Sequence, residues 1–102
     1  MTKTLATFAL ALALPALAAS DGAAIFKSKC SMCHGADGAG QTSLGKTLKI
    51  RDLRSPEVQK LTDVELTKII AGGKGKMPGF GKQLSNEDLE ALIAHIRTLK
   101  AK

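Results

Sequence analysis

The sequence predicts a small all-α protein of one domain, with three main helices and one short helical turn. The chain has 102 residues, the length of a single domain. Residues 21–29, 62–71 and 85–100 each begin with a side chain that can cap a helix and continue with apolar residues at helical spacing. No segment shows a convincing strand pattern.

Residues 1–18 have the features of a secretory signal peptide. Lys3 supplies the positive start, residues 5–14 the apolar run, and Ala16-Leu17-Ala18 a small-x-small cleavage site. We expect cleavage after Ala18, or as a second choice after Ser20. The alternative is an uncleaved membrane anchor, but the apolar run is short for a bilayer span and Pro15 interrupts its end.

The expected mature domain covers residues 19–102. Without Lys3 it has 14 basic and 9 acidic residues, a net charge of +5 against +6 for the full chain. Export predicts a periplasmic protein, or one of the thylakoid lumen if it serves photosynthesis.

The first expected helix leads directly into Cys30-Ser31-Met32-Cys33-His34. Ser20 or Asp21 caps this helix. Gly22 lies four residues before Phe26 on the same side, where it can let another backbone approach closely.

A Cys-x-x-Cys-His segment is the attachment signature of a c-type haem. The thiols of Cys30 and Cys33 can each bond to one vinyl group of the same porphyrin. His34 then lies beneath the ring, where an imidazole nitrogen can bind iron. A partner ligand must come from elsewhere in the chain.

Two other sites are possible for a Cys-x-x-Cys pair. A redox disulfide of the thioredoxin kind belongs in a βαβ setting, which this sequence lacks. A zinc site needs four ligands, so His95 would have to join from a distant helix. Export favours haem further, because attachment consumes two thiols that would otherwise tend to form a disulfide.

Two glycine-containing stretches follow the motif. Residues 35–40 predict a loop, and residues 45–53, which lack clear periodicity, predict a second loop covering one edge of the porphyrin. Lys46, Lys49 and Arg51 could pair there with haem propionates, although simple solvation is the more common fate of such side chains.

The stretch 55–57, Ser-Pro-Glu, predicts a short helical turn with Ser55 as its cap, and Thr62 to Glu65 has the form of a capping box. The next helix ends at Gly72-Gly73, and Leu66, Ile69 and Ile70 give its buried face.

Residues 72–81 hold the candidate for the second iron ligand. A thioether is a soft ligand suited to haem iron, and a Met/His pair raises the reduction potential. Pro78 restricts the backbone of Met77, which would help to hold its sulfur in place. Met1 belongs to the signal segment, and Met32 lies inside the motif, poorly placed to reach the opposite face. Met77 is therefore the predicted distal ligand, with core packing as its alternative.

Ser85 caps the last helix, which carries an apolar stripe and, one position away from it, His95. We expect His95 to lie at the rim or in solvent. The stripe consists of Leu89, Leu92, Ile93, Ile96 and Leu99.

The basic residues are scattered, with no basic run and no aromatic platform for bases, so nucleic acid is not the expected partner. They form either an ordinary solvated surface or a cationic face for an acidic protein. The chain is short and has only three aromatic residues, so a macrocycle would supply much of its core.

These motifs resemble those of the small class I c-type cytochromes, over the whole expected mature domain. Gly22 and Phe26 are similar to the family's N-terminal helix, Cys30-x-x-Cys33-His34 to its haem site, and Met77-Pro78 to its distal loop. The resemblance implies a small cytochrome c fold wrapped around one covalently bound haem c.

The sequence departs from the family pattern in two places. Many relatives carry an aromatic residue on the last helix against the first, where this chain offers Leu92, Ile93 and Ile96. No proline soon after the motif is present to offer a carbonyl to His34, so the group that fixes its tautomer stays open.

The resemblance implies a monomeric one-electron carrier rather than an enzyme, because two axial ligands leave no position on iron for a substrate. Its partners would be redox proteins with acidic docking surfaces, with no stable membrane insertion after cleavage. The alternatives are small-ligand binding or peroxidase-like activity with labile Met77, and a carrier dedicated to one dehydrogenase or oxidase.

Overall fold

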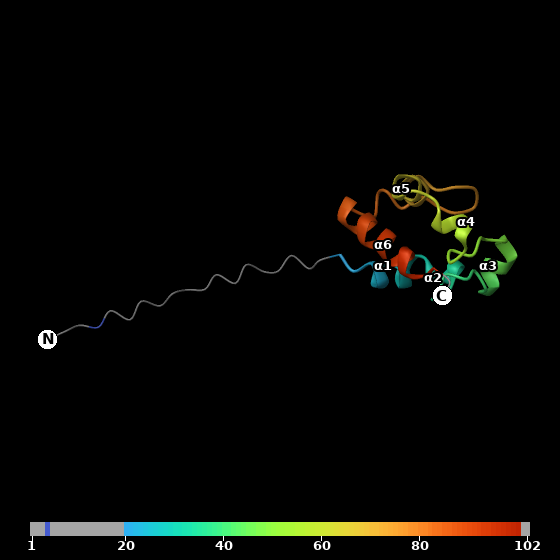
Figure 1. Ribbon diagram of the computed structural model, residues 1–102, viewed down its shortest axis with the longest axis horizontal. Helices are drawn as coiled ribbons and strands as arrows, with labels where there is room; N and C mark the ends of the chain where they lie inside the picture. Colours follow the sequence, from blue (N-terminus) through green and yellow to red (C-terminus); the bar gives the residue numbers. More distant parts are fainter. Residues whose placement is uncertain (1–3, 5–19, 101–102) are drawn as a thin grey trace.

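The computed structural model describes residue 4 and residues 20–100 (Figure 1). The predicted signal segment, apart from residue 4, lies outside the described residues, and so does the candidate cleavage bond after Ala18. The second candidate bond, after Ser20, lies at the start of the described range. The described part contains six α-helices and no strand beyond one isolated bridge between Lys74 and Met77. The helices are α1 (Gly22–Lys29), α2 (Ser31–His34), α3 (Ser43–Leu48), α4 (Pro56–Gln59), α5 (Asp63–Gly72) and α6 (Asn86–Thr98).

The predicted all-α architecture is confirmed, with α1, α5 and α6 as the three main helices and α4 as the short turn. Each begins at the predicted cap. The side chain of Asp21 accepts a hydrogen bond from Ala24 N, and Ser55 caps α4. Thr62 and Ser85 each form a complete capping box. These side chains satisfy backbone N–H groups that a helix leaves unpaired at its start.

The first and last helices cross at Gly22. A Cβ placed on Gly22 would lie 2.0 Å from the carbonyl oxygen of Ala91, so only glycine allows the two backbones to meet at this distance. Phe26, one turn further along α1, is 2% exposed and packs with Leu92 in the core. The predicted close approach at Gly22 is therefore confirmed.

His95 makes a contact that the sequence did not predict. Its ring is half-buried, with its centroid 5.1 Å from that of Phe26 and the two planes tilted by 50°. A tilted ring pair at this distance is a favourable aromatic contact. His95 thus supplies the ring contact between the last and first helices that the sequence assigned to aliphatic residues alone.

The prediction of a loop over residues 45–53 is wrong for its first part, where α3 extends to Leu48. Thr42 caps this helix by accepting a hydrogen bond from Gly45 N, and Lys49 ends it in the left-handed conformation with φ 54°. The helix is too short to show apolar periodicity in the sequence, so Thr42 as a possible cap is the only local sign of it. The remainder, residues 49–53, is irregular as predicted.

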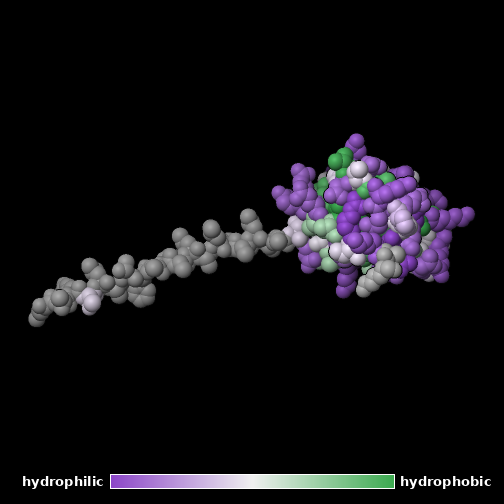
Figure 2. Space-filling model, in the orientation of Figure 1, coloured by the Kyte–Doolittle hydropathy of each residue, from purple (hydrophilic) through white to green (hydrophobic). Residues whose placement is uncertain are grey.

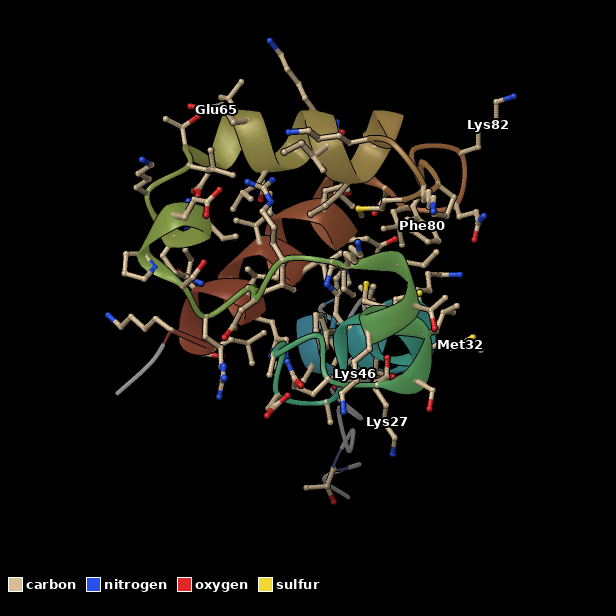
Figure 3. The ribbon with its side chains drawn as sticks, turned by 90° about the vertical axis from the view of Figure 1, so that its right-hand side faces the viewer. Lys27, Met32, Lys46, Glu65, Phe80 and Lys82 are labelled. Atoms are coloured by element: carbon tan, nitrogen blue, oxygen red, sulfur yellow. The ribbon has the colours of Figure 1, made fainter. Side chains whose placement is uncertain are left out.

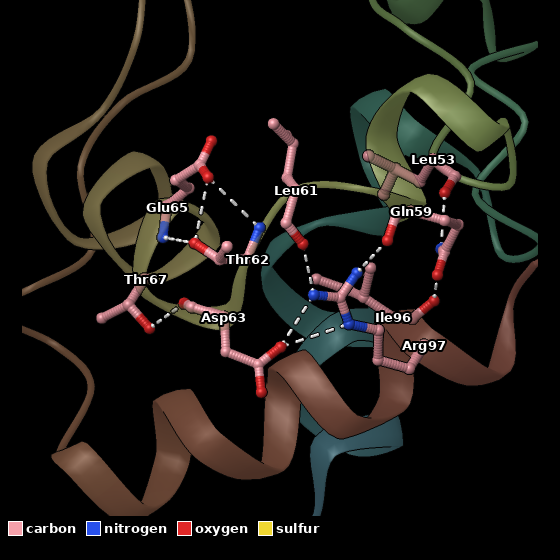
Figure 4. A network of polar contacts seen from close by, with 9 residues as sticks. All are labelled: Leu53, Gln59, Leu61, Thr62, Asp63, Glu65, Thr67, Ile96 and Arg97. Carbon is pink, nitrogen blue, oxygen red and sulfur yellow. Dashed lines mark hydrogen bonds and ion pairs between the residues drawn. The ribbon is translucent and has the colours of Figure 1, made fainter.

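Arg97 on α6 fastens the segment between α4 and α5 (Figure 4). Its guanidinium donates to the carbonyl oxygens of Gln59 at 2.8 Å and Leu61 at 2.6 Å, and to the Asp63 carboxylate at 2.8 Å. The Gln59 side chain donates in turn to the carbonyls of Leu53 and Ile96. Charge-assisted bonds of this kind are among the stronger ones in a folded chain.

The surface in Figure 2 is mostly hydrophilic, with small, separate hydrophobic areas. No helix among residues 20–100 combines the length and apolar character that crossing a bilayer requires. The core cluster lies between α1, α5 and α6, and its buried members are Phe26, Cys30, Val58, Leu66, Ile70, Leu84, Leu89, Leu92, Ile93 and Ile96.

Candidate haem site

The predicted attachment segment forms a tight helical turn directly after α1. Cys30 N donates to Phe26 O at 2.9 Å, which ends α1, and His34 N donates to Cys30 O at 2.9 Å. Gly35, with φ 78°, then turns the chain away. Both cysteines are free thiols, Cys30 buried and Cys33 half-buried. The motif is therefore held as one rigid unit at the end of the first helix.

Two adjoining cavities lie beside this unit. The larger has a volume of about 500 Å³ and is bordered by Cys30, His34 and Met77 together with core residues such as Phe26 and Leu92. The smaller, of about 120 Å³, is bordered by Cys33 and again by Cys30, His34 and Met77. All four predicted site residues are thus brought together, although Met77 lies 43 positions after His34.

His34 has an environment suited to a metal ligand. Burial lowers the pKa of its imidazole, which favours the neutral form that binds metals. Its Nδ1 is buried and has no hydrogen-bond partner among the described residues. A buried polar atom of this kind normally has a partner, so no described residue fixes which nitrogen of the imidazole carries the proton.

Burial also affects the neighbouring thiol. It raises the pKa of Cys30 to about 11, the nearby Cys33 adds to the rise, and Lys29 opposes it. Cys30 is therefore an uncharged thiol near neutral pH, compatible with its position against Phe26 in the core.

The backbone around Met77 is held in a defined turn. Met77 N donates to Lys74 O at 3.0 Å, and Lys74 N donates to Met77 O at 3.1 Å. Gly73, with φ 82°, lies so close that a Cβ there would be 2.8 Å from the carbonyl oxygen of Met77. Gly79 and Gly81 lie against the end of α5 in the same way. The glycines of this loop therefore fix Met77 at the cavity.

The three cations predicted to pair with propionates differ in position, and two lysines of the Met77 loop lie beside them. Lys49, Arg51, Lys74 and Lys76 border the larger cavity, whereas Lys46 does not. Arg51 also pairs with Glu57 at 3.3 Å. Lys46 is exposed, and Lys27 and Lys82 project away from the ribbon in Figure 3. Of the propionate candidates, the structure keeps Lys49 and Arg51 at the site.

The sequence did not predict Leu48 and Ile50 as walls of both cavities, nor Thr42 as a contact of the motif. The sequence does offer one sign of α3: Thr42 is a residue type that caps helices, and its side chain accepts a hydrogen bond from Gly45 N.

The two cavities have mostly apolar walls and lie between the segment that carries Cys30 and Cys33 and the thioether of Met77. The cavity walls, the neutral imidazole and the two free thiols fit a covalently attached porphyrin. The fold and the site thus define a haem-binding protein of the c type.

Comparison with known proteins agrees. The family described as cytochrome c oxidase, cbb3-type, subunit III matches residues 17–96. A cytochrome c6 of Rippkaea orientalis is 36% identical over 87% of this chain and 79% of its own length, and one of Microcystis aeruginosa is 37% identical over 74% and 90%. Among solved structures, the c-type cytochrome KustC0563 has a TM-score of 0.73 at 32% identity, covering 79% of this chain and 99% of its own. Cytochrome c6C of Synechococcus sp. PCC 7002 has a TM-score of 0.59 at 26% identity, over 76% and 90%.

The chain belongs to the class I c-type cytochromes. It is an electron-transfer protein that carries covalently attached haem c, not an enzyme.

Proposed function

We propose that the chain is a one-electron carrier in which Cys30 and Cys33 hold the haem and His34 and Met77 are the axial ligands. The observation that carries this proposal is the shared cavity border, where four side chains from two distant segments meet. Haem c, when bound, supplies a reversible one-electron couple.

Each residue has a separate task in this proposal. Neutral His34 would offer a nitrogen to the iron, and Met77, held by its turn, would be the second protein ligand and so leave no coordination position for a substrate. Leu66, Ile70 and Leu92, all buried, give the larger cavity an apolar wall. Ligands held this firmly need little rearrangement when the charge on iron changes.

The test is a redox titration of the holoprotein followed by optical spectra. The ferric protein should show a sulfur-to-iron charge-transfer band, and Met77→Ala should abolish this band and lower the reduction potential. Met32→Ala is the matched control, because Met32 is 77% exposed and projects into solvent (Figure 3). High-spin iron in the unaltered protein would instead support small-ligand binding or peroxidase-like activity.

We further propose that a lysine surface docks acidic redox proteins rather than nucleic acid. It comprises the exposed residues Lys27, Lys29, Lys74, Lys76 and Lys82. Three of them border the cavities: Lys29 and Lys76 the smaller, Lys74 and Lys76 the larger. Weak, steered docking suits a monomeric carrier that must leave quickly, whether it serves several partners or one dedicated enzyme.

Steering predicts that electron transfer slows as ionic strength rises. The measurement is the bimolecular rate with an acidic redox protein over a salt series, with a neutral small-molecule oxidant as the control. A rate with the acidic protein that stays level with salt excludes docking by this surface.

Removal of residues 1–18 and export to the periplasm, or to a thylakoid lumen, are also part of the proposal. Its support is the signal-like pattern of Lys3, the apolar run and Ala16-Leu17-Ala18, and the Ser20 hydroxyl, close after the expected cut, donates to the Asp88 carboxylate at 2.8 Å. Intact mass of the exported protein measures the cut directly. A mass that retains residues 1–18 contradicts it.

A further inference from the structure

One hydroxyl joins the haem-attachment segment to α3. Thr42 Oγ1 donates to the carbonyl oxygen of Cys33 at 2.9 Å, across nine positions of sequence, and accepts from Gly45 N at 2.9 Å. The same side chain therefore caps α3 and binds the backbone of the motif. A cap alone requires only the second of these bonds.

The backbone of residues 40–45 lies against the same carbonyls. A Cβ on Gly45 would lie 2.4 Å from the Cys33 oxygen, so α3 approaches the motif as closely as glycine permits. Gly40 N donates to the carbonyl of His34 at 2.8 Å. Two consecutive carbonyls, of Cys33 and His34, are thus bound by one short segment.

The imidazole of His34 has no comparable restraint. Its Nδ1 has no hydrogen-bond partner among the described residues, although a metal-binding histidine normally donates its second nitrogen to a carbonyl or carboxylate. The orientation of the ring must then depend on how the backbone that carries it is held.

We propose that Thr42 is a positioning residue for the proximal ligand: its hydroxyl holds the Cys33 carbonyl and so sets the plane and tilt of the His34 ring. This inference rests on the proposed ligation by His34. In this proposal Thr42 restrains the His34 ring in place of the hydrogen bond that Nδ1 does not make.

The experiment compares Thr42→Val, Thr42→Gly and Thr42→Ser in the ferric holoprotein. Valine keeps the shape and removes both bonds, glycine removes the donor but is tolerated as a cap, and serine retains donor and acceptor. Thr47→Val is the matched control, because Thr47 lies on the same helix and its hydroxyl donates only to Ser43 O within α3, at 2.9 Å.

The readouts are the ferric haem-methyl NMR shifts, which report the plane of the axial imidazole, and the reduction potential. We expect the valine and glycine variants to share a redistribution of the methyl shifts and a displaced potential. The serine variant and Thr47→Val should both have the methyl shifts and the reduction potential of the unaltered protein. Valine and glycine spectra that match the Thr47→Val spectrum would overturn the proposal.

A measurement on the unaltered holoprotein covers the case in which the variants fail to mature. The Thr42 hydroxyl proton should exchange slowly and show a scalar coupling to the Cys33 carbonyl carbon. A rapidly exchanging hydroxyl without that coupling also overturns the proposal. Failure of the proposed function is distinguishable, because the unaltered protein itself would then lack bound haem or His34 ligation.

Discussion

At the scale of single residues, Gly22 shows how strongly one missing side chain can determine a helix crossing. The carbonyl of Ala91 occupies the space where a Cβ would lie, and the Cβ of His95 is only 3.1 Å from the same point. Backbone cannot move aside as a flexible side chain can. The crossing of α1 and α6 therefore depends on this glycine.

Gly22→Ala should destabilise the holoprotein by about 2–3 kcal/mol, because an added methyl in a packed interface forces the helices apart. Guanidinium unfolding followed by circular dichroism measures this difference. Gly72→Ala is the control: a Cβ on Gly72, also helical, meets nothing within 4 Å, so alanine should be neutral or stabilising by up to about 1 kcal/mol. Equal stability of the two variants would contradict the interpretation of the crossing.

The site residues differ in how far the sequence alone could identify them. Cys30, Cys33 and His34 form a local pattern whose spacing carries its own chemical reason. Met77 required elimination of the other methionines, and its meeting with His34 at the cavity depends on the whole fold. The contact of His95 with Phe26 could not be predicted, because the position lies beside the apolar stripe and histidine has no fixed preference for burial.

At the scale of elements, the sequence predicts the capped helices best. Thr62 and Ser85 are followed by acidic residues at the third helical position, and both capping boxes are present. Helix α3 was missed because it is only six residues long and has a glycine at its centre, which intrinsic propensity disfavours. Its stability comes from tertiary contact with the attachment segment, which no local pattern reports.

The capping box of α6 makes a specific prediction for acid stability. Hydrogen bonds from Ser85 N and then from the Ser20 hydroxyl hold the pKa of Asp88 below its ordinary value of 3.8. Because the pKa of Asp88 is lower in the folded than in the unfolded chain, its charge stabilises the fold fully at a pH above the unfolded-state pKa. This contribution is lost as the pH falls through the folded-state pKa.

Asp88→Asn keeps an acceptor oxygen but loses the charge, so it should lower the unfolding midpoint at about pH 7, and the deficit should shrink below about pH 4. The measurement is the guanidinium midpoint of the holoprotein across that range. The control is Glu90→Gln, since Glu90 is an exposed carboxylate of the same helix without a hydrogen bond or ion pair among the described residues. A deficit that persists unchanged into acid would show that geometry, not charge, matters at Asp88.

At the scale of the whole molecule, the cavity and the core share their residues. Phe26, Val58, Leu66, Ile70, Leu92 and Ile96 belong both to the buried cluster and to the border of the larger cavity. The arrangement of α1, α5 and α6 is therefore supported from inside by whatever fills that space. Residues of the attachment segment, of α3 and its C-terminal end, and of the loop after α5 all border this cavity, although they are far apart in the sequence.

The chain without haem should consequently be largely unfolded. Without haem the apolar walls of this cavity of about 500 Å³ would be exposed to water, and the roughly 5–15 kcal/mol of net stability in small domains leaves little margin for such exposure. Collapse of the walls would reduce this exposure only by rearranging the same core side chains.

The double variant Cys30→Ala, Cys33→Ala, produced without haem maturation, tests this dependence and avoids an adventitious disulfide. Its far-ultraviolet circular dichroism should show little helix, and its amide exchange little protection, while the holoprotein under the same conditions remains helical. The variant retains Phe26, Leu92, all the caps and the Arg97 network. Cooperative unfolding of a helical apo variant would therefore mean that protein contacts alone are sufficient for the fold, and that haem is not required for it.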